Sequence, residues 1–175
     1  KVIAKVGRQI ITLDNHRYVG HVGWRQDRQT FDAATVDYAA SENIKISYSY
    51  INKRNRIFAQ AKDLHSKDHL LNFAYKTPYG KLTAYSYLLE IDEGASNGLD
   101  TFGVSFSGQK DKFLYSAQLA TQSAESAVSD YSTKYMAIEG GYKFDTVTLK
   151  LGAEILASDD AMYGFSTPLA TLHKF

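Results

Sequence analysis

The stretch Ile44-Lys45-Ile46-Ser47-Tyr48-Ser49-Tyr50 alternates apolar and polar residues without interruption. Successive side chains of a β-strand point to opposite faces of a sheet, so this stretch predicts a strand with one apolar face and one polar face. The same two-residue period recurs in Phe102–Ser107, Phe113–Ala120 and Val147–Ile155. Because the period is two and not the 3.6 of an amphipathic helix, the chain is predicted to be all-β.

Nine such segments can be placed along the chain. Their predicted bounds are 2–9, 30–40, 44–51, 69–77, 81–91, 100–109, 113–123, 134–143 and 147–157. Together they cover about half of the chain, well above the ~20–25% strand content of an average globular protein. Short turns and long polar connections alternate between the segments. This order predicts an antiparallel up-and-down meander over residues 1–175, with no internal domain boundary and with all tight turns at one end.

The alternation of turns and loops is typical of outer-membrane barrels, whose strands are about ten residues long. Soluble sandwiches with Greek-key crossings have no reason to keep it. Aromatic residues gather near the strand ends on the apolar face, as in the girdle of a transmembrane β-barrel, while small and charged residues on the opposite face suit a wet lumen. The apolar face is therefore predicted to point outward. The aromatic residues assigned to it are Tyr38, Tyr48, Tyr50, Tyr75, Tyr85, Tyr87, Phe113, Tyr115 and Tyr142.

Composition narrows the function classes further. The longest charge-free apolar stretch, Leu82–Leu89, is too short for a membrane-spanning helix, which needs roughly 18 residues or more. A net charge of +1 lacks the basic footprint of a general nucleic-acid binder, so no nucleic-acid partner is expected. The sequence has no Cys, and the pairs His16/His21 and His65/His69 lack the carboxylates of a metal motif. We therefore predict no metal and no cofactor, and we expect these histidines in loops, the second pair within a short loop helix.

The strand count bears on closure of the barrel. Nine is odd, whereas single-chain bacterial barrels use even numbers of strands. The chain starts at Lys1, and Pro168 with the irregular stretch Leu169–Lys174 does not resemble a closing strand. The sequence therefore predicts an internal fragment of a larger barrel.

The first long connection, residues 10–29, and its flanks carry the densest set of polar side chains in the chain. Arginines mixed with Asp and amide side chains can bind carboxylates and hydroxyls in bidentate geometry. Rings of Arg in a pore select for anions. The same charges could equally lie on a solvated loop and pair with one another, and the residues alone leave both interpretations open.

Two blocks of sequence resemble the alginate-export family of outer-membrane porins. The first comprises Gly7–Gln9, Leu13–Gly20, Val22–Gln26 and Gln29–Ala33, and the second is Phe165–Phe175. The blocks bracket most of the chain, and between them only the strand rhythm matches. Members of this family are large monomeric barrels of several hundred residues. The resemblance therefore implies that this chain supplies about half of one barrel.

The resemblance also implies a function. The lumen of family members is constricted and lined with basic residues that attract a polyuronate, and loops or plugs gate it. At matching positions it implies Arg8, Arg17 and Arg25 as pore-lining residues, with Asp14 and Asp32 orienting them. We therefore expect a bacterial outer-membrane porin, not an enzyme, for export or passive diffusion of alginate-like anionic saccharides or related small solutes. Its other partner would be outer-membrane lipid, and its assembly a monomeric barrel.

Two alternatives come from other classes of protein. The first is a soluble β-barrel ligand-binding module, in which the same alternation separates core residues from surface residues. An outer-membrane barrel lipid hydrolase could use Ser166 and His173 with Asp159 or Asp160 nearby. No Gly-x-Ser-x-Gly elbow accompanies this serine, and a triad is defined by geometry and not by closeness in sequence.

Overall fold

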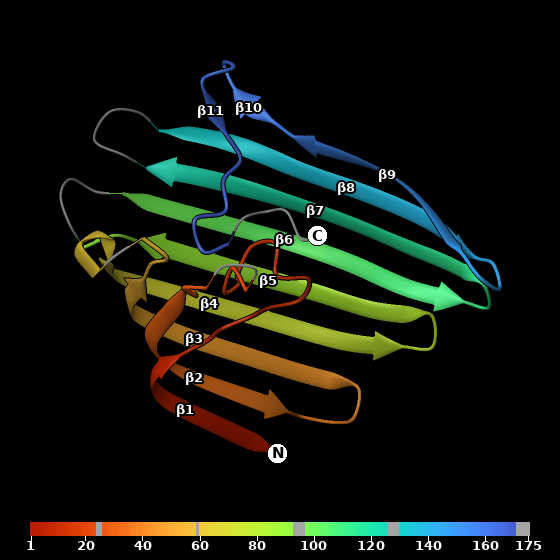
Figure 1. Cartoon of the computed structure of the whole chain (residues 1–175), viewed down its shortest axis with the longest axis horizontal. Coiled ribbons are helices and arrows are strands. Elements are labelled where there is room, and N and C mark those ends of the chain that lie inside the picture. The colour runs from red at the N-terminus through yellow and green to blue at the C-terminus, as the bar shows by residue number, and fades with distance from the viewer. Residues whose placement is uncertain (24–25, 59, 93–96, 126–129, 171–175) are drawn as a thin grey trace.

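The computed structural model describes residues 1–23, 26–58, 60–92, 97–125 and 130–170 (Figure 1). Nine strands form one antiparallel sheet, and each strand pairs with its neighbour in sequence. The predicted all-β up-and-down meander is confirmed. The strands are β1 (Val2–Gln9), β2 (Thr30–Ala39), β3 (Ile44–Asn55), β4 (Leu64–Thr77), β5 (Gly80–Glu90), β6 (Gly98–Lys110), β7 (Phe113–Glu125), β8 (Tyr131–Lys143) and β9 (Thr148–Leu156). A small hairpin of β10 (Ser158–Asp159) and β11 (Tyr163–Gly164) follows.

The sheet is curved but open, because β1 and β9 each pair with a single neighbour (Figure 1). An open sheet of nine strands agrees with the prediction of a partial barrel. Among the residues that the structure describes, no helix is long and apolar enough to cross a membrane.

The connection between β3 and β4 differs from the prediction. It is shorter than expected, because β3 continues to Asn55 and β4 already begins at Leu64. The expected loop helix is wrong: His65 and His69 both lie in β4, and the described part of the connection contains the 3₁₀ turn η1 (Gln60–Lys62) as its one helical element. The strict alternation also fails in β3, where the register with β4 shifts between Ile51 and Lys53. Such a β-bulge reverses which face the following side chains occupy.

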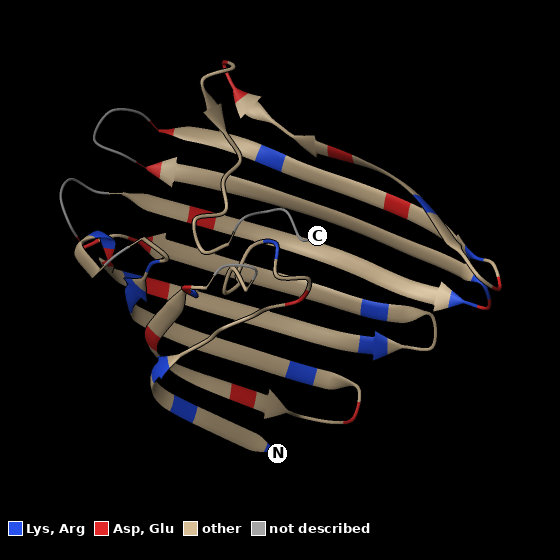
Figure 2. Cartoon of the chain, in the orientation of Figure 1, with Lys and Arg blue, Asp and Glu red and all other residues tan. Residues whose placement is uncertain are grey.

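The two faces of the sheet have different surroundings. We call the face that packs against residues 10–23 the inner face, and the opposite one the outer face. Strand register places rows of apolar side chains across the outer face, such as Val104, Leu119, Met136 and Ile155 on β6 to β9. These side chains are 41–53% exposed. The central stretches of β3 to β7 carry no charged residue (Figure 2). The apolar face therefore points outward, away from the folded segments.

Two of the aromatic residues assigned to the outer face lie on the inner one. Tyr85 and Tyr87 are 6% and 4% exposed, and their rings stack 4.9 Å apart. The assignment is wrong because both faces of β5 carry large apolar residues, so its alternation does not say which face is outside. Gly103 pairs with Tyr85, and a Cβ there would lie 2.2 Å from Tyr85 Cζ. The glycine therefore makes room for the tyrosine ring.

The core lies between the inner face and two segments that fold over it. Tyr18 packs against the rings of Tyr85, Tyr135 and Phe165, with centroids 5.4–5.8 Å apart. Val19 and Leu169 form an isolated parallel bridge. We call residues 10–23 the inner connection. It carries apolar residues into the concavity of the sheet, and residues 165–170 hold it there.

Candidate functional site: a polar pocket on the inner face

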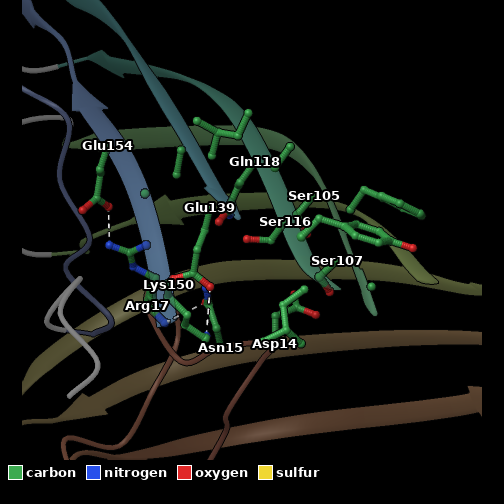
Figure 3. Close-up of a pocket in the computed structure, with 18 of the residues that line it drawn as sticks. Asp14, Asn15, Arg17, Ser105, Ser107, Ser116, Gln118, Glu139, Lys150 and Glu154 are labelled. Atoms are coloured by element: carbon green, nitrogen blue, oxygen red, sulfur yellow. Dashed lines mark hydrogen bonds and ion pairs between the residues drawn. The ribbon is translucent and has the colours of Figure 1, made fainter. Parts of the chain in front are cut away.

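A pocket of about 820 Å³ opens between the tip of the inner connection and strands β5 to β9 (Figure 3). The strands contribute runs of consecutive residues to its lining, and every second side chain of such a run points to the inner face. The charged side chains that line it are Asp14, Arg17, Lys81, Glu139, Lys150 and Glu154. The uncharged polar ones are Asn15, Ser105, Ser107, Ser116 and Gln118.

The charged residues of the pocket form ion pairs. Lys81 Nζ lies 2.8 Å from Asp14 Oδ1, and Lys150 Nζ lies 2.9 Å from Glu139 Oε1. The guanidinium of Arg17 pairs with the carboxylate of Glu154. Each basic group that lines the pocket thus faces a carboxylate, so the formal charges of its lining cancel.

These pairs also fix the tip of the inner connection. Asp14 accepts hydrogen bonds from Lys81 on β5 and from Asn72 on β4, the latter at 2.7 Å. At the other end, Glu154 on β9 accepts from Arg17 and from the Tyr135 hydroxyl. Positive φ angles at Asp14 and His16, 49° and 62°, make the tight turn between these anchors. The tip is therefore bound on both sides of the pocket.

Below the tip, the inner connection is anchored by apolar packing. Tyr18 is 8% exposed and Val19 1%. Burial, and then the neighbouring Tyr85, raise the pKa of the Tyr18 phenol, so this side chain stays neutral. Gln29 donates from Nε2 to the carbonyl oxygens of Leu169 and Gly20, at 2.8 and 3.3 Å. The inner connection and residues 165–170 therefore form one packed unit on the sheet.

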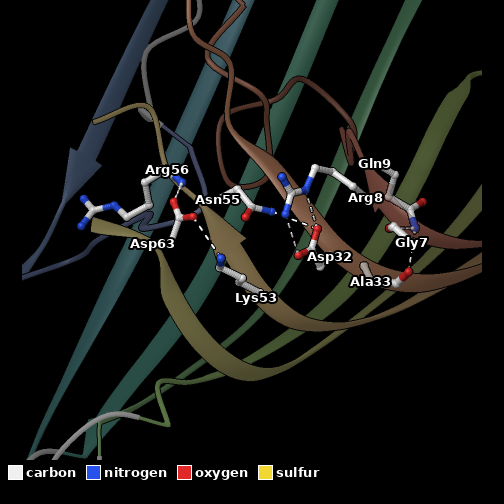
Figure 4. A network of polar contacts seen from close by, with 9 residues as sticks. All are labelled: Gly7, Arg8, Gln9, Asp32, Ala33, Lys53, Asn55, Arg56 and Asp63. Carbon is white, nitrogen blue, oxygen red and sulfur yellow. Dashed lines mark hydrogen bonds and ion pairs between the residues drawn. The ribbon is translucent and has the colours of Figure 1, made fainter. Parts of the chain in front are cut away.

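The structure brings only some of the predicted site residues together. Asp14 and Arg17 line the pocket, and Arg25 lies outside the described residues. Arg8 and Asp32 lie elsewhere: Arg8 Nε and Nη2 donate to the two carboxylate oxygens of Asp32 at 2.8 and 3.0 Å (Figure 4). Pore lining by these residues stays a prediction.

Arg8 lies on a different face from the pocket residues. Its neighbour Gln9 bonds to Ala33 O and Thr35 Oγ1 on the inner face of β2. Arg8 alternates with Gln9 and therefore shares the outer face with Val6, which is 87% exposed. Asn55 Nδ2 donates to Asp32 Oδ1 at 3.1 Å, which extends this polar network to β3. The Arg8–Asp32 pair therefore belongs to the outer face.

Sequence reasoning missed Lys81 and Gln118 as pocket residues. It assigned charged residues to the polar face but did not group Glu139, Lys150 and Glu154 into one site. Lys150 and Glu154 are four residues apart in one strand and so must share a face, which is a signal that the sequence contains. The approach of these residues to the inner connection depends on sheet curvature, and no local pattern reports that.

The serine of the hydrolase alternative is held through its backbone. The backbone N–H of Ser166 donates to Gln122 Oε1 at 2.8 Å, and Gln122 Nε2 donates back to Ser166 O at 2.9 Å. His173 lies outside the described residues. Within the described ranges, no group of three or more His, Asp or Glu side chains is arranged to hold a metal ion.

Comparison with known proteins places the chain in a family. A family model described as "Alginate export" matches residues 1–155. The match spans β1 to β8 and all but the last residue of β9. Searches of curated proteins and of solved structures give no match. Because the family model covers most of the sequence, the chain belongs to the alginate-export family.

Proposed function

We propose that this chain forms part of the wall of an outer-membrane channel. The channel would pass anionic saccharides, such as alginate-like polyuronates, or related small solutes by export or passive diffusion. One observation carries the proposal: the sheet exposes an apolar outer face and holds a polar, charged pocket on its inner face. A transmembrane barrel has this arrangement, whereas a soluble barrel has the reverse. Membership of the alginate-export family supports the same reading.

The limits of the outer apolar surface support placement in a bilayer. Near the tight turns it carries exposed aromatic residues, including Phe113 at 61% and Phe144 at 55%. Near the long loops the outer positions become polar, for example Ser123 on β7 and Lys134 on β8. Aromatic residues at the interface and polar residues beyond it are typical of outer-membrane barrels.

Passage would depend on weak electrostatic contacts in the lumen. Arg17, Lys81 and Lys150 present nitrogen donors to the pocket, and their carboxylate partners hold these donors in place. A solute carboxylate could exchange its water for such donors at several sites and still leave, as conduction requires. In this proposal Arg17 and Arg25 line the path, Asp14 holds the tip of the inner connection beside it, and no chemical step occurs. Arg8 and Asp32, which pair on the outer face, have no part in it.

The test is ion selectivity of the full-length protein in planar bilayers. The wild type should conduct anions in preference to cations. The double variant Arg17→Glu with Arg25→Glu should lower or invert that preference. Arg56→Glu is the matched control, because Arg56 follows β3 and contacts Phe58 outside the pocket. Unchanged selectivity in the double variant would remove the assigned role of these arginines.

Solubility separates the channel from the soluble alternative. A protein with an apolar outer surface of this extent should aggregate when it is purified without detergent and should be monodisperse in detergent. A monodisperse, folded protein in plain buffer would favour the soluble ligand-binding module instead.

A further inference from the structure

The floor of the pocket is made by four uncharged polar side chains on two neighbouring strands. Strand register sets Ser107 of β6 opposite Ser116 of β7, and Ser105 opposite Gln118. Directly paired residues have Cβ atoms about 4.5–5.5 Å apart. The four side chains therefore form one continuous patch, which we call the hydroxyl floor (Figure 3).

The three hydroxyls of this floor are available to a solute. Among the described residues, none of the hydroxyls of Ser105, Ser107 and Ser116 has a hydrogen-bond partner. Two other polar groups of the inner face are satisfied internally: Ser47 donates to Asp37 at 2.5 Å, and Gln122 donates to Thr101 at 2.8 Å. A hydroxyl can donate one hydrogen bond and accept others, so the floor offers both kinds of contact.

Gln118 adds a fixed acceptor to the hydroxyls. Its Nε2 donates to the Tyr85 hydroxyl at 2.8 Å. That contact orients the amide, because the nitrogen is held against the tyrosine and the carbonyl oxygen keeps its acceptor capacity. The floor therefore combines adaptable hydroxyls with one oriented amide.

The charges around the floor do not favour an anion strongly. Lys81 is paired with Asp14 on the β5 side, and Lys150 with Glu139 on the β9 side. A paired cation attracts a solute carboxylate much less than a free one, because its own carboxylate repels that solute at nearly the same distance. Contacts with hydroxyl groups do not carry this penalty. The pocket volume of about 820 Å³ lies within the range of small-molecule sites.

We propose that the hydroxyl floor binds the hydroxyl groups of a saccharide, so that a neutral oligosaccharide occupies this pocket at least as well as a uronate. The inference rests on the proposed function only in placing the pocket inside a channel. It assigns recognition in this pocket to Ser105, Ser107, Ser116 and Gln118, and it separates that recognition from the charge selectivity assigned to the arginines.

The test uses maltotriose as the neutral probe and full-length protein in planar bilayers. The maltotriose concentration that halves the ion current is measured for the wild type and for Ser107→Val with Ser116→Val. Valine keeps the branched shape that suits a strand and removes the hydroxyl. Loss of two hydrogen bonds should raise the half-blocking concentration about tenfold. Ser86→Val is the matched control, because Ser86 pairs with Leu71 and Phe102 on the outer face and should leave the block unchanged.

Calorimetric titration of the detergent-solubilised protein with maltotriose gives a readout that does not need conduction. If no variant conducts but maltotriose binding is present and weakened by the valines, the channel proposal fails and the hydroxyl floor stands. If the protein conducts but maltotriose neither blocks nor binds, or does so equally in the valine variant, the hydroxyl floor is overturned. The single variant Ser116→Ala answers the same question should the double variant not fold. A mannuronate trimer that binds at least tenfold more tightly than maltotriose would also overturn the proposal.

Discussion

Arg17 and Glu154 form an ion pair although 137 residues of sequence separate them. Arg17 belongs to the inner connection and Glu154 to β9, the last strand of the sheet. The pair therefore ties a segment inside the curve of the sheet to one of its open edges. Asp14, three residues before Arg17, forms the matching contact with Lys81 on β5.

Glu154→Gln should increase the single-channel conductance of the full-length protein. The ion pair is partly exposed and contributes at most about 1 kcal/mol to docking of the inner connection. Loss of the ion pair should increase, several-fold, the fraction of time for which this segment is displaced from the pocket. Glu42→Gln, in the exposed turn between β2 and β3, is the control. Equal conductance in both variants would show that the pair does not restrict the passage.

Tyr18→Ala should release the inner connection more completely than loss of the ion pair. The tyrosine ring packs against Tyr85, Tyr135 and Phe165, and truncation of a buried aromatic residue typically costs about 3–5 kcal/mol. Amide hydrogen exchange of residues 10–23 should accelerate, while exchange of β6 and β7 stays slow. Tyr38→Ala, which removes an exposed ring on the outer face, should leave exchange in residues 10–23 unchanged. Faster exchange in both variants would argue against a local role for Tyr18.

Asp68→Asn should destabilise the folded protein strongly. The side chains of Arg54 and Asp68 are 4% and 0% exposed, and two hydrogen bonds of 2.8 and 2.6 Å join them. Breaking a buried pair leaves an uncompensated charge and costs about 3–5 kcal/mol. Asp92→Asn, which breaks the exposed pair with Lys67, should cost no more than about 1 kcal/mol. Urea unfolding from lipid vesicles measures both values, and similar losses would contradict the burial argument.

The buried pair also admits a rescue experiment. Replacing both partners, Arg54→Met with Asp68→Leu, removes the charges together and should recover much of the stability lost in Asp68→Asn. A double variant as unstable as Asp68→Asn would instead point to a specific need for the hydrogen bonds that Asp68 accepts from the Ser66 hydroxyl and from the backbone N–H of Glu90.

Lysine substitutions on the outer face should report depth in the bilayer. Leu119 lies in the apolar row of β7, and Ser123 lies four residues further toward the loops on the same face. Leu119→Lys should lower the free energy of unfolding in vesicles by about 2–4 kcal/mol, and Ser123→Lys by about 0–1 kcal/mol. Equal effects at the two positions would mean that lipid does not cover this face.

The sequence predicted the strands well because alternation is a local property. All nine strands lie where the two-residue period places them, with the largest shift at the start of β4, which begins at Leu64 and not at residue 69. This part of β4 pairs with the end of β3, where the bulge after Ile51 interrupts the two-residue period. The polar residues of 64–68 also resemble a loop. Arg54 owes its place on the inner face to that bulge, whereas Asp68 alternates regularly with Leu70. The two-residue period alone therefore does not predict their ion pair.

The candidate site could be predicted only in part. The inner connection was recognisable as a dense polar segment, and Asp14 and Arg17 do line the pocket. Its apolar residues Tyr18 and Val19, buried against Tyr85 and Leu169, were hidden among the polar ones. Such contacts join segments far apart in the chain and depend on how the sheet curves, which is a property of the whole fold.

The bridge between Val19 and Leu169 has a consequence for biogenesis. A segment near the start of the described chain completes its packing only with a partner that is synthesised after β9. If the strands enter the membrane one after another, docking of this segment is therefore completed only after β9 and residues 165–170 have formed. Deletion of residues 165–170 alone from the full-length protein should for the same reason loosen the inner connection and raise the conductance of the channel.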